Sequence, residues 1–115
     1  MRTVTLDVKP LSESLDAFAR VWKSGKGEAS SRISFETPEL LWKVLTARRW
    51  ELLKAMAAQR PMSLREAARR VDRDVKGVHT DVHALLDAGV LRRSDDGRIE
   101  FPYDAVHVDF TLRAA

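Results

Sequence analysis

Hydrophobic positions alternate with polar ones at both ends of the chain, which is the pattern of half-buried β-strands. Residues 3–8, TVTLDV, alternate strictly and predict a short strand. Residues 32–35, RISF, predict a second one. Val106, Val108 and Phe110 alternate again and predict a last strand or an extended tail.

The segment between the first two strands divides into a helix and a linker. Apolar residues three and four positions apart within residues 12–23 form one stripe, which predicts an amphipathic helix that needs a partner surface. Residues 24–31, SGKGEASS, are small and polar and predict a flexible linker. We therefore expect residues 1–31 to form a strand and helix arm with its linker, and residues 32–115 to form the main domain.

The central part of the chain carries several signals for helix starts. Thr37 is a predicted N-cap, and its helix pauses near Thr46 before it resumes. Ser63 and Glu66 have the spacing of a capping box, in which each side chain bonds the backbone amide of the other residue. Asp74 is the predicted N-cap of the helix that follows.

The helix that begins after Asp74 is predicted over residues 75–88, and Gly89 supplies the left-handed residue that ends it. An Asp-Gly step then predicts a hairpin between residues 90–93 and 98–101. The apolar side of the helix, which we expect to face the core, consists of Val75, Val78, Val82, Leu85 and Leu86. Two short helices, a tight turn between them and a following hairpin predict an α+β fold with the element order of a winged helix-turn-helix.

Composition narrows the class of protein. A chain of 115 residues is long enough for one compact domain. With no cysteine, disulfide scaffolds and thiolate metal sites are excluded. The sequence shows neither an export signal nor the run of about 18 apolar residues that a membrane span requires. We therefore expect a cytoplasmic protein without membrane contact.

Charge is concentrated in the middle of the chain. The formal net charge is +3, from 20 Lys and Arg against 17 Asp and Glu. Residues 46–80 hold nine basic and four acidic side chains, so this segment is +5 and the remainder is −2. An excess rich in arginine is typical of a surface that meets phosphates, but it also suits a solvated, ion-paired helix surface.

Two stretches of sequence resemble a known class of regulators. They are SLREAARRV, residues 63–71, and VHTDVHALLDAGVLRR, residues 78–93. They resemble the MarR- and ArsR-like winged-helix regulators of prokaryotes, and are especially similar to small DNA-binding, antitoxin-like regulators with a V-H-x-D-V-x-A-L helix. The resemblance covers about residues 33–104, and the turn at 72–74 departs from it because it lacks the usual glycine. It implies double-stranded DNA as a partner and a two-fold homodimer, formed through residues 12–24 or 38–58.

The predicted DNA contacts fall on three elements. The face of helix 75–88 opposite its apolar side would enter the major groove; it consists of Lys76, Gly77, His79, Thr80 and His83. Arg65 and Arg69 lie on the first helix of the pair, which would cross the DNA backbone, and Arg73 lies in the turn. Arg93 and Arg98 flank the hairpin tip and are predicted phosphate contacts, although Asp95 and Asp96 at the tip oppose deep insertion.

Some of these residues have other interpretations. Gly77 costs about 1 kcal/mol relative to alanine inside a helix, which either marks a close approach to DNA or is a neutral accident. Asp81 would repel phosphates, so we expect it to face Arg48 or Arg49. His79 and His83 have a zinc-ligand spacing, but a regulatory metal site is the less favoured interpretation.

No catalytic constellation is recognisable, so we predict a protein that is not an enzyme and that needs no cofactor. The three tryptophans, at residues 22, 42 and 50, have core-facing spacing and favour packing or a dimer seam over ligand stacking. The favoured function is sequence-specific DNA binding by a dimeric, autoregulatory transcriptional regulator or repressor. The alternatives are an antitoxin-like protein that neutralises a toxin-like partner protein and represses its operon, and a winged domain used only for protein binding.

Overall fold

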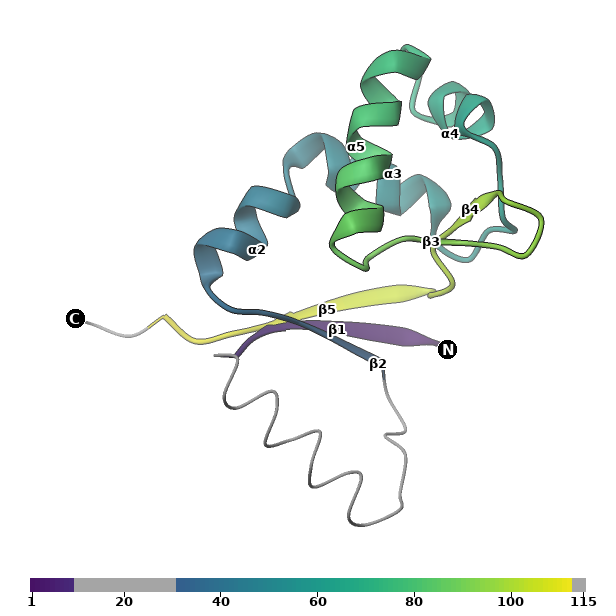
Figure 1. Ribbon diagram of the computed structural model, residues 1–115. Coiled ribbons are helices and arrows are strands. Elements are labelled where there is room, and N and C mark those ends of the chain that lie inside the picture. The colour runs from purple at the N-terminus through teal and green to yellow at the C-terminus, as the bar shows by residue number, and fades with distance from the viewer. Residues whose placement is uncertain (10–30, 113–115) are drawn as a thin grey trace.

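The computed structural model describes residues 1–9 and 31–112, and in this part of the chain it shows an α+β fold (Figure 1). The helices are α2 (Pro38–Val44), α3 (Ala47–Met56), α4 (Leu64–Arg70) and α5 (Val75–Asp87). The strands are β1 (Thr3–Val8), β2 (Ser31–Phe35), β3 (Arg92–Arg93), β4 (Ile99–Glu100) and β5 (Ala105–Asp109). The predicted helix over residues 12–23 and nearly all of the predicted linker lie outside the described residues.

Three strands form a parallel sheet in the order β2-β1-β5. Leu6 of β1 lies opposite Ile33 of β2 on one side and Val108 of β5 on the other. The alternation predicted all three strands, but it could not show that the first strand lies between the other two. Residues 3–8 therefore belong to the same folded unit as residues 31–112, which differs from the predicted separate arm.

The helices of the described residues, α2 to α5, lie on one side of this sheet (Figure 1). Val4 and Leu6 of the central strand are fully buried, as are Leu41 of α2 and Leu52 of α3. The hydrophobic core thus lies between the apolar face of the sheet and the helical layer, because strand residues two positions apart share a face.

Local capping bonds start every described helix. Thr37, Thr46, Ser63 and Asp74 each accept a hydrogen bond from the backbone amide three residues later, which satisfies an amide that the helix itself leaves unpaired. The predicted N-caps and the predicted pause at Thr46 are confirmed. The capping box is half formed, because the Glu66 carboxylate accepts hydrogen bonds from Arg69 and Arg70 instead.

The hairpin β3–β4 follows α5, as predicted. Gly89 and Gly97 have positive φ angles of 79° and 83°, a conformation that glycine adopts without strain. Ile99 pairs with Met62 as an antiparallel bridge, so the hairpin is joined to the residue just before the N-cap of α4. The hairpin is thereby held on the α4–α5 unit and not on the parallel sheet.

Two predicted core positions are wrong. Val75 is 43% exposed because it is the first residue of α5 and lies beyond the core that the rest of the helix covers. Trp42 is 56% exposed, although its ring packs edge to face on Phe110 just after β5. Within the described residues, no helix is both long enough and apolar enough to span a membrane.

Candidate nucleic-acid interface

Helix α5 separates its apolar and polar sides as predicted. Val78, Val82 and Leu85 are fully buried in the core. On the other side, Lys76, His79 and Thr80 are exposed, and His83 is half-buried. The first two turns of α5 therefore present a cation, an imidazole and a hydroxyl to solvent.

Asp81 is the buried exception on this polar side. Its Oδ1 accepts a hydrogen bond from Arg49 Nε at 3.0 Å, and its Oδ2 lies 2.8 Å from Arg73 Nη2. Arg49 also donates to the Val44 carbonyl at 3.1 Å, so this arginine ties the junction of α2 and α3 to α5. The expected pairing of Asp81 with an arginine of residues 48–49 is confirmed for Arg49.

Arg73 has a structural role that its sequence position did not reveal. Its side chain is 21% exposed, its charge is paired with Asp81, and its Nη1 is buried without a hydrogen-bond partner among the described residues. Arg73, a predicted phosphate contact in the turn, therefore has its guanidinium group paired inside the molecule with a buried carboxylate.

Gly77 also has an explanation inside the molecule. A Cβ atom at this position would lie 2.9 Å from Asp74 Oδ1 and 3.3 Å from Arg73 Nη2. Asp74 Oδ1 is the acceptor of the N-cap hydrogen bond from the Gly77 amide, at 2.8 Å. Glycine is therefore explained by crowding from the cap and from Arg73, and a close approach of DNA is not needed to account for it.

The two histidines of α5 lie against one another. Their ring centroids are 4.1 Å apart and the rings are tilted by 37°. No group of three or more metal-binding side chains occurs among the residues described, so this pair has no third ligand there. Thr80 Oγ1 lies 3.4 Å from the Lys76 carbonyl oxygen, a long contact that leaves the hydroxyl available to other acceptors.

The arginines of α4 differ in how free their charges are. Arg65 is exposed, and no carboxylate lies within ion-pair distance of it in residues 1–9 and 31–112. Arg69 donates through Nε to Glu66 Oε2 at 2.9 Å, and Arg70 donates to Oε1 of the same carboxylate at 3.0 Å. Hydrogen bonds from these guanidinium groups lower the pKa of Glu66 to about 2.

This low pKa predicts a measurable contribution of Glu66 to stability at acid pH. Because the folded-state pKa lies below the unfolded value, the stabilisation is present above about pH 4.5 and is lost as pH falls toward about 2. Urea denaturation at several pH values should show a steeper loss of stability between pH 4.5 and 2 for the wild type than for Glu66→Gln. Equal pH profiles for the two proteins would contradict this assignment.

The hairpin arginines divide in the same way. Arg92 donates to Glu100 Oε1 at 2.6 Å, and Arg98 Nε lies 3.4 Å from Asp96 Oδ2. The hydrogen bond from the Ser94 hydroxyl is the main cause that lowers the pKa of Asp96, which keeps its charge close to Arg98. Arg93 donates only to the Gly97 carbonyl, at 3.3 Å, and has no carboxylate partner in the described chain. Of the two predicted phosphate contacts on the hairpin, Arg93 has no carboxylate partner among the described residues, whereas Arg98 is paired with Asp96.

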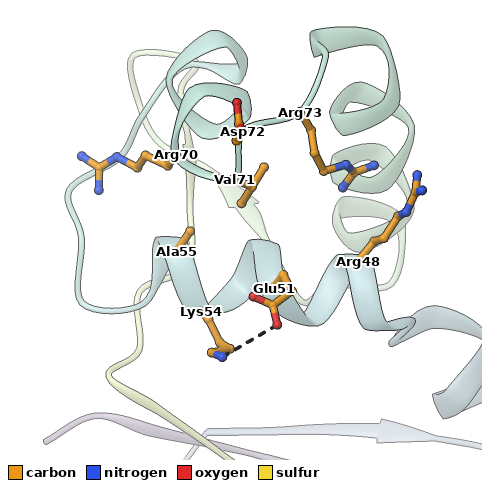
Figure 2. A pocket seen from close by; sticks show the side chains of 8 residues that line it. All are labelled: Arg48, Glu51, Lys54, Ala55, Arg70, Val71, Asp72 and Arg73. Atoms are coloured by element: carbon orange, nitrogen blue, oxygen red, sulfur yellow. Dashed lines mark ion pairs between the residues drawn. The ribbon is translucent and has the colours of Figure 1, made fainter.

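A pocket of about 500 Å³ lies between α3 and the end of α4 (Figure 2). Arg48 and Arg73 lie on one side of it, and Arg70 points away on the opposite side. Arg48 and Arg73 also line a second pocket with Asp74 and Gly77, at the beginning of α5. Arg48 is exposed and without an ion-pair partner among the residues described, so it extends the basic surface from α5 onto α3.

Arg48 was absent from the predicted contacts. Its only signal in the sequence was its membership of the basic segment 46–80, since helical spacing within α3 does not show that this residue lies next to the beginning of α5. The structure thus brings Arg48, Arg73 and Gly77 together around one pocket. Arg65 and the hairpin arginines do not line this pocket.

Comparison with known proteins gives one match. The model of the HVO_A0114 family matches residues 44–108, which is more than half of the chain and includes α3, α4, α5 and the hairpin. No curated protein matches the sequence. No solved structure matches it either. The matched residues contain the whole α3 to β4 unit, and the chain belongs to the HVO_A0114 family.

Proposed function

We propose that this protein binds double-stranded DNA as a winged helix-turn-helix regulator of transcription, without enzymatic activity. The observation that supports this most strongly is the division of α5, which buries Val78, Val82 and Leu85 and exposes Lys76, His79 and Thr80 near its beginning. In helix-turn-helix proteins, the beginning of the second helix contacts base edges in the major groove.

The proposed roles follow from exposure and charge. Lys76, His79 and Thr80 offer donors to base edges and phosphates. Arg65 on α4 and Arg48 on α3 are exposed cations that would bind the DNA backbone. Arg93 would bind backbone from the hairpin, the element that corresponds to the wing. Arg69 and Arg98 would contribute less, because carboxylates already pair with them.

Asp81 has a positioning role in this proposal. A carboxylate on the polar side of a DNA-reading helix would repel phosphates if it were exposed. The ion pairs to Arg49 and Arg73 neutralise it and fix the beginning of α5 against α3. The polar side of α5 can therefore be positive although it includes an acidic residue.

The expected result is a steep dependence of duplex affinity on salt. Four phosphate contacts per protomer, by Arg48, Arg65, Lys76 and Arg93, correspond to a log–log slope of about −3.6 for each protomer bound, and to a loss of roughly 150-fold per protomer between about 50 and 200 mM salt. Fluorescence anisotropy with a labelled duplex drawn from the upstream region of the protein's own gene measures this slope. Affinity that does not change with salt would overturn the proposal.

We also propose that the DNA-binding form is a homodimer. Regulators of this type commonly read two half-sites through two-fold symmetry, because one small module contacts few bases. The apolar side chains of Leu40 and Trp42, which are 41% and 56% exposed, support a protein contact near α2.

A further inference from the structure

Both outer strands of the parallel sheet, β2 and β5, have an open edge in the described residues, and apolar side chains border the edge of β5. β5 is the last strand in the order β2-β1-β5, so its outer edge has no strand partner in residues 1–9 and 31–112. The Ala105 amide donates to the Arg2 carbonyl of the neighbouring chain segment at 3.3 Å. Since backbone groups alternate along a strand, the amides of Val106 and Val108 point to the open edge. Such an edge is a template for another strand.

Apolar surface borders this strand. A pocket of about 390 Å³ opens between Val108 of β5 and the junction of α2 and α3, where Trp42, Leu45 and Trp50 line it. The Trp42 ring packs edge to face on Phe110, with centroids 5.9 Å apart. Trp42 nevertheless remains 56% exposed, which is a large apolar area to leave in water.

We propose that β5 pairs antiparallel with β5 of a second copy, about a two-fold axis at Val108, to give one continuous six-stranded sheet. In this register Val106 lies opposite Phe110 of the second copy on the apolar face. On the polar face, His107 lies opposite Asp109, and symmetry repeats this pair. A register shifted to His107 would set the two histidines against each other, so the His107–Asp109 pairing and the apolar pairing of Val106 with Phe110 both favour Val108 as the centre.

The geometry of this interface suits the helical layer. A two-fold axis perpendicular to a continuous sheet keeps equivalent faces on the same side, so α2 to α5 of both copies lie on one side of it (Figure 1). Only one consequence rests on the proposed function: two α5 helices on one side could address two DNA half-sites. The interface itself does not require DNA binding.

The experiment is sedimentation velocity of the full chain over a range of concentrations, without DNA. His107→Asp places a carboxylate opposite Asp109 twice per dimer, and the lost and repulsive pairs together should raise the dimer dissociation constant about tenfold. The matched variant His107→Asp/Asp109→His exchanges the two side chains and should restore the dimer dissociation constant. Both side chains are exposed, so neither change threatens the fold.

Each outcome of the sedimentation experiment either supports or overturns the proposed β5 interface. A concentration-dependent dimer that His107→Asp weakens and the exchange restores supports the β5 interface. A wild type that stays monomeric, or a His107→Asp protein that dimerises like the wild type, overturns it. Because DNA is absent, failure of this interface is distinct from failure of DNA binding, which the salt dependence of affinity measures separately.

Discussion

Replacement of Arg65, Lys76 and Arg93 together by alanine is expected to weaken duplex binding by roughly 100-fold or more and to reduce the salt slope by about 3 per protomer. The three side chains come from α4, α5 and β3, and all are exposed without a carboxylate partner in the described part of the chain. Their charges are therefore available to phosphates. Exposed positions of this kind change stability by only about 0.5 kcal/mol, so the variant should remain folded.

The matched control removes the same number of charges elsewhere. Arg2, Lys43 and Lys54 are exposed, and none belongs to α4, α5 or the hairpin: Arg2 precedes the central strand β1, Lys43 lies on α2, and Lys54 lies on α3, where it pairs with Glu51 at 3.8 Å. Their replacement by alanine lowers the net charge equally, but should change the affinity only slightly. If both triple variants lose the same affinity, net charge and not a localised surface governs binding, and the assigned interface is wrong. Fluorescence anisotropy at fixed salt measures both.

The second large effect concerns stability. Asp81→Ala is expected to lower the free energy of unfolding by about 2–4 kcal/mol, because it leaves Arg49 and Arg73 largely buried without their shared anion. The figure is below that of a fully buried pair, since both arginines retain some contact with water. A urea titration should show a lower midpoint with an unchanged m-value.

Asp87 provides the control for this prediction. It is an exposed carboxylate at the end of the same helix, and Asp87→Ala should shift stability by no more than about 0.5 kcal/mol. The Asp81 variant should also lose DNA affinity, because α5 loses its tie to α3. An Asp81→Ala protein as stable as the wild type would show that the two ion pairs only offset the cost of burying the charges.

The comparison of the sequence with the structure separates local from distant interactions. Thr37, Thr46, Ser63 and Asp74 were recognisable because an N-cap hydrogen bond joins residues only three positions apart. Burial of Val78 and Val82 was recognisable from helical periodicity. The prediction that Val75 is buried was wrong, because periodicity does not show where along a helix the core ends.

Only part of the candidate interface could be predicted, because ion pairing and helix packing join residues that are distant in the sequence. The sequence shows which side chains are cations. It does not show which of these cations are already paired with a carboxylate and are therefore less available to DNA phosphates. Arg73 is paired with Asp81, eight positions away on α5, whereas the pairing of Arg98 with Asp96 joins residues only two positions apart in the hairpin turn. Arg48 gained its place beside α5 from the packing of α3, which no local pattern records.

The sequence by itself determined the helices, their starts, the hairpin and the polar side of α5, since these depend on residues a few positions apart. Only the tertiary structure decided that β1 lies between β2 and β5, that Asp81 joins Arg49 to Arg73, and that β5 has an open edge. Those features join residues up to about a hundred positions apart, and their energies depend on which surfaces the folded chain brings together.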